Sequence, residues 1–144
     1  CVTGGSYGGY MTNWIITHTD RFSAAVSLMS TSNWISKLLC CDDSHSKMII
    51  LGGTPWDDPE TLWRHSPLRY VKNVKTPTLF VQNEHDYRSP PCEAEMMFTA
   101  LCRLGVPAKM VMNYGASHNS MNLAQKKNMY EQSIAWFNTY TQQP

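Results

Sequence analysis

The chain has 144 residues, of which 42% are hydrophobic and 16% are charged, and its formal net charge is +1 at pH 7. This profile is typical of one globular domain, and the lack of a basic run interleaved with aromatic residues excludes a nucleic-acid-binding surface. The longest apolar runs span only a few residues, which excludes a membrane-spanning helix, and nothing in the sequence resembles a signal peptide.

The first predicted feature is a tight turn around Ser6. Residues 1–3 are too few to establish a strand, but residues 4–8 spell G-x-S-x-G, a pattern that holds a nucleophilic serine out of a strand-to-helix turn. A serine in a plain glycine turn is the alternative. Apolar and aromatic side chains then recur at helical spacing, at Tyr7, Tyr10, Met11, Trp14, Ile15 and His18. This series predicts a helix that packs on a sheet through these side chains.

Two strands and a long excursion are predicted for the middle of the chain. Residues 22–29 are short and apolar, as in a buried parallel strand. Residues 30–73 are polar and irregular, and we expect a structured excursion across the sheet edge with one short helix after Pro59. The next strand is predicted at residues 78–81, where Pro77 is tolerated at the strand start.

The remaining residues alternate between helix and strand. One helical series ends at the stop signal of Gly105 and Pro107, and its members are Ala94, Met97, Phe98, Leu101 and Leu104. Residues 108–114 predict a strand, and a closing amphipathic helix is predicted from Tyr130, Ser133, Ile134, Trp136, Phe137 and Tyr140. The alternating order predicts an α/β fold in which a mostly parallel sheet carries helices on both faces.

The cysteines indicate a reducing compartment. Their number is odd and their spacing fits no disulfide framework, which predicts free thiols and a cytoplasmic location for Cys1, Cys40, Cys41, Cys92 and Cys102. The stretch CCDDSH at residues 40–45 could be a metal site, but adjacent cysteines point different ways and no second ligand pair follows at finger spacing. A solvated loop is the preferred interpretation, and we expect neither a metal ion nor a cofactor.

An acid and a histidine follow the later strands in the order used by α/β-hydrolases. Asp86 comes after the strand at 78–81 and His118 after the strand at 108–114, and sites form at the carboxyl ends of parallel strands. A neutral imidazole can take the proton of a serine, and a carboxylate can orient the imidazole. Glu84 or His85 could compete with Asp86, and His118 could be a solvated loop residue. The other histidines, His18, His45, His65 and His85, are predicted to be surface or capping residues.

Several segments together resemble the catalytic domain of the prolyl oligopeptidase family of serine peptidases, in its acylaminoacyl-peptidase and dipeptidyl-peptidase-like branches. They are GGSYGGYMTNW, LGGTPWDDPETLWRHSPLRYVKNVKTPTLF, HDYRSP, FTALCRLGVPAKMV and GASH. The resemblance runs from Cys1 to about Tyr140, and it implies an α/β-hydrolase fold. Residues 1–144 would be the C-terminal portion of that catalytic domain, starting at the nucleophile elbow, without its N-terminal strands, the propeller and the loop that gives the second oxyanion donor.

The resemblance also implies roles for individual residues. Ser6 matches the nucleophile, Asp86 the acid and His118 the base, and the backbone N–H of Tyr7 matches one oxyanion donor. One departure is Gln82-Asn83, where family members usually carry His-Gly, and it bears on how Asp86 is placed because Asn adopts unusual backbone angles less readily than Gly. Without the preceding strands, we expect an exposed sheet edge that pairs with another copy.

Three functions follow from these observations. The first is a serine peptidase that cleaves acylated residues or dipeptides from small peptides through an acyl-enzyme. The second is a carboxylesterase of the same fold, because the same three residues cleave esters. The third is a catalytically inactive fragment that acts as an interaction module. A small peptide is the expected partner, and no nucleic acid or membrane partner is expected.

Overall fold

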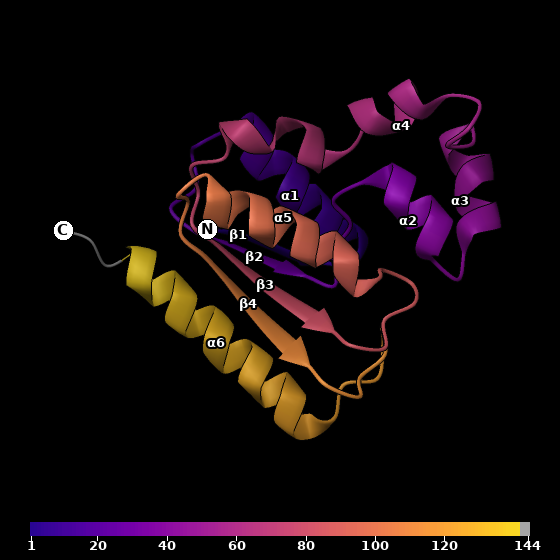
Figure 1. The fold of residues 1–144 in the computed structure, drawn as a ribbon. Coiled ribbons are helices and arrows are strands. Elements are labelled where there is room, and N and C mark those ends of the chain that lie inside the picture. The colour runs from indigo at the N-terminus through magenta and orange to yellow at the C-terminus, as the bar shows by residue number, and fades with distance from the viewer. Residues whose placement is uncertain (142–144) are drawn as a thin grey trace.

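In the computed structural model, which describes residues 1–141, four strands form one parallel sheet (Figure 1). They are β1 (Val2–Gly5), β2 (Ala25–Leu28), β3 (Thr78–Asn83) and β4 (Ala108–Asn113), in the order β1-β2-β3-β4. All three pairings are parallel. The strands therefore end at one edge of the sheet, where the loops that follow them lie close together.

Helices cover both faces of this sheet, as the sequence predicts (Figure 1). On one face, Phe80 packs with residues of α1 (Tyr7–His18), η1 (Pro67–Asn73) and α5 (Pro91–Arg103). On the other face, α6 (Leu123–Thr141) covers the sheet through Met129. Side chains alternate between the two faces of the sheet along a strand, so neighbouring residues of β2 and β3 are buried in the cores on opposite faces. Burial on both faces explains why the two strands have continuous apolar runs.

The first helix packs on the sheet through a different face from the predicted one. The residues toward the sheet include Gly9 and Ile16, and a Cβ atom on Gly9 would lie 2.6 Å from the carbonyl oxygen of Leu28. The prediction that the aromatic stripe packs on the sheet was wrong, because Tyr10 packs against Trp34 instead. Small residues let the helix approach β2 closely, so the bulky residues are left for the neighbouring segment.

That neighbouring segment, residues 30–73, is more regular than the single predicted helix. It contains α2 (Trp34–Cys40), α3 (Ser44–Leu51), α4 (Pro59–Arg64) and η1. Side-chain caps start two of these helices: Asn33 accepts a hydrogen bond from Ile35 N at 3.0 Å, and Asp58 accepts one from Thr61 N at 3.0 Å. Trp34, Leu38 and Leu62 of this segment form a small core with Tyr10 of α1.

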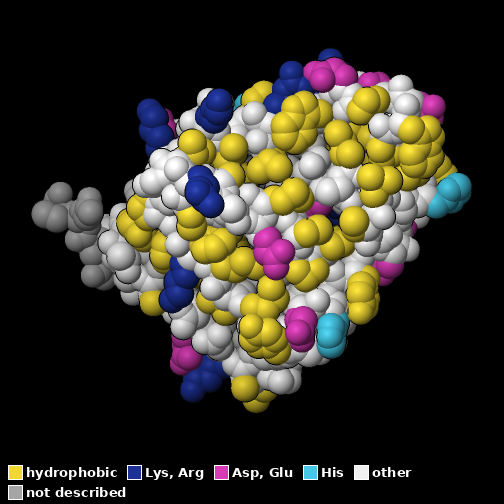
Figure 2. Space-filling model, in the orientation of Figure 1, with side chains coloured by type: hydrophobic (Ala, Val, Ile, Leu, Met, Phe, Trp, Pro, Cys, Tyr) yellow, Lys and Arg dark blue, Asp and Glu magenta, His cyan; other side chains and the backbone are white. Residues whose placement is uncertain are grey.

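The short helices of this segment leave apolar side chains on the surface. Leu39, Ile49, Ile50 and Trp56 are all exposed. Figure 2 shows hydrophobic side chains gathered over α2 to α4, in the upper right of the view. The predicted solvated loop at residues 40–45 was wrong in part, since Cys40 ends α2 and α3 begins at Ser44, although Cys40 and His45 are exposed.

The later elements follow the prediction more closely. In α5, Ala94, Met97 and Leu101 are buried. In α6 the predicted face is correct for Trp136 and Phe137, which pack with Met129 against the sheet, and wrong for Tyr130 and Ile134, which are exposed. None of the helices within residues 1–141 combines the length and the apolar character that a membrane crossing needs.

Candidate active site

Ser6 lies at a sharp turn between β1 and α1. Its backbone has φ 56° and ψ −116°, a left-handed φ that non-glycine residues rarely adopt and that costs on the order of 1–3 kcal/mol. Hydrogen bonds fix this geometry, because Ser6 N donates to Leu28 O at 2.9 Å and Tyr10 N donates to Ser6 O at 3.0 Å. A Cβ atom on Gly4 would lie 2.4 Å from the carbonyl oxygen of Gly8, so the lack of a side chain on Gly4 permits the close crossing of strand and helix.

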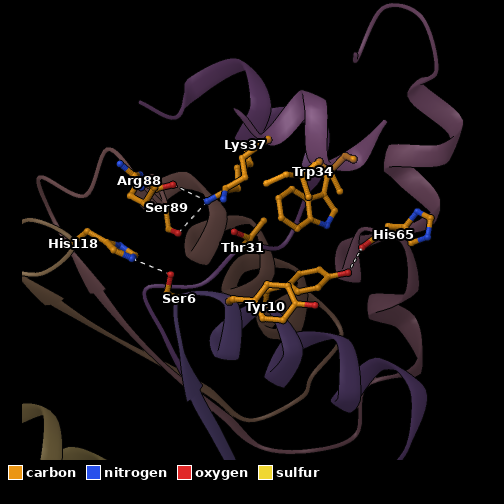
Figure 3. A pocket seen from close by; sticks show the side chains of 13 residues that line it. Ser6, Tyr10, Thr31, Trp34, Lys37, His65, Arg88, Ser89 and His118 are labelled. Atoms are coloured by element: carbon orange, nitrogen blue, oxygen red, sulfur yellow. Dashed lines mark hydrogen bonds between the residues drawn. The ribbon is translucent and has the colours of Figure 1, made fainter. Parts of the chain in front are cut away.

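Three side chains from three loops meet at the carboxyl edge of the sheet. His118 Nε2 lies 2.9 Å from Ser6 Oγ, a contact drawn as a dashed line in Figure 3. His118 Nδ1 lies 2.8 Å and 2.9 Å from the two carboxylate oxygens of Asp86. Ser6, Asp86 and His118 are far apart in the sequence, but each of them follows a strand of the parallel sheet. The structure brings the three side chains together at one edge of the sheet, as the strand order predicts.

The carboxylate of Asp86 is fully buried and held by backbone donors. Asp86 Oδ1 accepts hydrogen bonds from Arg88 N at 3.0 Å and from Ser89 N at 2.7 Å. These donors compensate the loss of hydration that a buried carboxylate suffers. The alternative acid, Glu84, is partly exposed and accepts a hydrogen bond from Gly115 N at 2.8 Å. The carboxylate that reaches His118 is therefore that of Asp86.

The pair Gln82-Asn83, where the resembling family usually has His-Gly, is buried at the end of β3. Asn83 is in extended conformation rather than at a positive φ, so the backbone here does not need glycine. Gln82 Nε2 donates to Ser89 O at 2.9 Å and lies 3.5 Å from Asp86 Oδ2. Asn83 Nδ2 donates to Ser117 O at 2.8 Å. The two amides thus contact the loops that carry the acid and the histidine.

A cavity of about 430 Å³ opens beside Ser6 (Figure 3). Its walls come from α1 and from the helices of residues 30–73, and they include Tyr10, Thr31, Trp34, Ile50 and Leu51. The Tyr10 hydroxyl donates to His65 O at 3.0 Å, and burial raises the pKa of Tyr10. Tyr7, the first residue of α1, also lines the cavity. Its backbone N–H has no carbonyl one turn earlier in the helix to bind, which is the situation of an oxyanion donor.

Two buried ionisable side chains, Lys37 and Glu93, lie near each other, and Lys37 lines the cavity. Lys37 Nζ donates to Arg88 O at 2.6 Å and to Ser89 Oγ at 3.2 Å. Glu93 accepts hydrogen bonds from Asn33 N at 2.8 Å and, through its other oxygen, from Ser36 Oγ at 2.6 Å. Burial lowers the pKa of Lys37 and raises the pKa of Glu93. Sequence reasoning missed both residues, because their contacts depend on α2, a helix it did not predict.

The other histidines lie apart from the contact between Ser6 and His118. His18 stacks on Trp14 with ring centroids 4.1 Å apart, and His45 and His85 are exposed. His65 follows the last residue of α4, and its ring Nδ1 lies 2.8 Å from Thr61 O, yet its side chain also lines the cavity. Across residues 1–141, side chains of His, Cys, Asp and Glu do not gather in a group of three or more that could hold a metal ion.

The arrangement is suited to nucleophilic chemistry at a carbonyl carbon. A serine hydroxyl within hydrogen-bond distance of an imidazole, which itself contacts a buried carboxylate, can lose its proton as it attacks. The parallel sheet, the strained turn at Ser6 and the order Ser, Asp, His define the class of the protein as an α/β-hydrolase.

Comparison with known proteins gives the family. The sequence pattern of the prolyl oligopeptidase family matches residues 1–144, and the chain belongs to that family. The uncharacterized peptidase YuxL of Bacillus subtilis is 46% identical over 125 residues, which cover 82% of this chain and 18% of YuxL. Dipeptidyl-peptidase 5 of Schizosaccharomyces pombe is 27% identical over 140 residues, which cover 96% of this chain and 20% of that protein.

Solved structures agree on the fold. The acylaminoacyl peptidase of Pyrococcus horikoshii matches with a TM-score of 0.90 and 30% identity, covering 99% of this chain and 24% of the peptidase. A puromycin-hydrolyzing peptidase of Mycobacterium tuberculosis matches with a TM-score of 0.90 and 27% identity, covering 99% of this chain and 22% of that protein. The chain thus spans 18% to 24% of the length of these four relatives.

Proposed function

We propose that the full-length protein containing these residues is a serine-type peptidase that hydrolyses short peptides. Acylated or dipeptide units at the N-terminus of the substrate are the proposed targets, in line with the acylaminoacyl peptidase and the dipeptidyl-peptidase among its relatives. The observation that carries the proposal is the chain of contacts from Ser6 Oγ through His118 to the buried carboxylate of Asp86.

In this proposal, Ser6 Oγ attacks the carbonyl carbon of the scissile peptide bond. His118 Nε2 takes the serine proton, and Asp86 stabilises the imidazolium through Nδ1–H. The Tyr7 N–H donates to the oxygen that becomes negatively charged. His118 then protonates the departing amine, which leaves an acyl-enzyme on Ser6. Water deprotonated by the same histidine attacks that ester and restores the free serine.

The cavity supports a peptide substrate. It adjoins both Ser6 and His118, and its aromatic and aliphatic walls suit the side chain of the residue whose carbonyl is attacked. Free cysteines further support the proposed cytoplasmic location, since all five are unpaired and three of them are exposed.

A fluorophosphonate probe tests the proposal on the full-length protein, because stable labelling requires an activated serine. We expect one label on Ser6, its loss in Ser6→Ala, and hydrolysis of aminoacyl or dipeptidyl p-nitroanilides that the same substitution removes. Ser23→Ala is the matched control, because Ser23 is an exposed serine just before β2, at the opposite end of the strands from Ser6. Hydrolysis of p-nitrophenyl esters without any cleavage of amides would instead identify a carboxylesterase, and no labelling would identify an inactive protein.

A further inference from the structure

The charged side chains that line the cavity are all cations. They are Lys37, Lys47 and Arg88, and no carboxylate is among the lining residues within the described part of the chain. Two of these three positive charges, at the rim of the cavity, are compensated by nearby carboxylates. Lys47 pairs with Asp43 at 3.4 Å, and Arg88 pairs with Asp42 at 2.6 Å. Both side chains are also partly exposed, so water and salt screen them further.

Lys37 differs from the two rim cations because it is buried, with only 4% of the residue exposed. Among the ion pairs of residues 1–141, none includes Lys37. Burial lowers the pKa of Lys37 and outweighs the opposite effects of Cys41 and of the carboxylates of Glu93 and Asp86. The oxygens of these two carboxylates are bound by other donors. The positive charge of Lys37 is therefore only partly compensated.

Hydrogen bonds fix Lys37 at the wall of the cavity. Its Nζ donates to Arg88 O and Ser89 Oγ, which occupy two of the three ammonium donors within the described residues. In Figure 3 the side chain runs from α2 toward Ser89, on the same side of the cavity as Ser6 and His118. A substrate side chain in the cavity would meet a cation that cannot swing away without breaking these bonds.

We propose that Lys37 sets the charge selectivity of the cavity, so that the substrate residue whose carbonyl Ser6 attacks has a neutral or acidic side chain and is not Lys or Arg. This inference rests on the proposed peptidase function and adds a substrate class to it. Like charges about 6 Å apart, at the effective dielectric constant of a protein, weaken binding roughly a hundredfold. An acidic side chain gains from the same field, although it loses hydration on entry.

The test uses the full-length protein and four N-acetylated aminoacyl p-nitroanilides. Norleucine and lysine share a linear four-carbon side chain and differ by the terminal ammonium, and glutamine and glutamate differ by one charge at the same size. We expect kcat/KM for norleucine to exceed that for lysine by about a hundredfold. In Lys37→Met that ratio falls at least about tenfold, and the ratio of glutamate to glutamine also falls. Lys127→Met, an exposed lysine on α6 across the sheet, leaves both ratios unchanged.

Comparing ratios of kcat/KM separates a change in charge selectivity from a general loss of activity that weaker support of the site would cause. Loss of the hydrogen bonds to Arg88 and Ser89 would slow all four substrates by a common factor, which cancels in each ratio. Equal ratios in Lys37→Met and the unmodified protein would overturn the inference. Equal cleavage of the lysine and norleucine substrates by the unmodified protein would also overturn it, and this result does not depend on whether the variant folds. Absence of both cleavage and fluorophosphonate labelling would overturn the proposed function itself.

Discussion

The side-chain amide of Asn83 donates a 2.8 Å hydrogen bond to the backbone carbonyl of Ser117, the residue directly before His118. The side-chain oxygen Oδ1 of Asn83 accepts a hydrogen bond of 2.9 Å from Asn113 Nδ2. Asn83 ends β3 and Asn113 ends β4, and both are buried. Two buried amides therefore link the strand that leads to the acid with the loop that carries the histidine.

We predict that Asn83→Ala loosens the position of His118. The substitution leaves the Ser117 carbonyl and the Asn113 amide without these partners, which costs about 1–3 kcal/mol of unfolding free energy for buried polar groups. The proposed base then moves relative to Ser6, so kcat should fall more than KM rises. Urea unfolding and steady-state kinetics on a p-nitroanilide measure the two effects.

Asn138→Ala on α6 is the control for Asn83→Ala, because Asn138 is exposed to solvent. It should leave kcat unchanged and should not destabilise the protein, because alanine is the better helix former. If Asn83→Ala kept the kcat of the unmodified protein, the rest of the histidine loop would be shown to hold His118 without the Asn83 side-chain amide.

Asp86→Asn should reduce turnover by about 10⁴-fold while the fold persists. Asparagine has nearly the same shape, so it can still accept from Ser89 N, but it carries no charge to stabilise the imidazolium and can present an N–H to His118 Nδ1. The measurement is kcat on an amide substrate, with circular dichroism as a check on folding. Glu84→Gln, which removes the neighbouring carboxylate in the same loop, should keep at least about a third of the activity; the reverse ranking would assign the acid role to Glu84.

The site geometry could be predicted largely because it depends on topology. Parallel strands end at one edge, so a serine, an acid and a histidine that each follow a strand must approach one another whatever the details of packing. Asp86 was predicted as the acid from the chain order Ser, Asp, His, and the family resemblance supported the choice of Asp86 over Glu84. The local pattern left it open, since both residues lie in the same loop and only the buried turn toward Arg88 N and Ser89 N distinguishes them.

Packing partners were less predictable. Periodicity identified α1 but not which of its faces meets the sheet, because Gly9 and Ile16 gain from close contact that hydrophobicity alone does not reveal. The helices of residues 30–73 are short and lack a strong apolar period, so their capping residues Asn33 and Asp58 were the available signals. Lys37 and the cavity wall went unnoticed for the same reason.

Glu93 should make the stability of the protein depend on pH. Burial raises the pKa of Glu93 above its ordinary value of 4.5, an effect that outweighs the hydrogen bonds from Ser36 and from the backbone of Asn33 and Ser32. Between 4.5 and the raised pKa, the folded chain keeps a proton that the unfolded chain has released. The unfolding free energy therefore falls as pH rises through this window.

Glu93→Gln, which cannot titrate there, tests the sign of this effect. The unfolding free energy of the variant minus that of the unmodified protein should increase as pH rises from 4.5, measured by urea unfolding at several pH values. Glu95→Gln, an exposed carboxyl on the same helix, should give a nearly constant difference. A difference for Glu93→Gln that shrinks with pH would mean that its hydrogen bonds outweigh burial.

The two glycines around Ser6 should differ sharply in their tolerance of a methyl group. A Cβ atom on Gly4 would lie 2.4 Å from the Gly8 carbonyl oxygen and 2.8 Å from its Cα, so strand and helix would have to separate at the turn that strains Ser6. We expect Gly4→Ala to cost about 3 kcal/mol of unfolding free energy and to abolish labelling by a fluorophosphonate. Gly8→Ala is the matched control for folding, because its Cβ would meet nothing within 4 Å and alanine favours a helix over glycine by up to about 1 kcal/mol. Urea midpoints for the two variants should therefore shift in opposite directions. Equal destabilisation would show that the turn needs glycine on both sides of the serine, as the G-x-S-x-G pattern taken alone suggests.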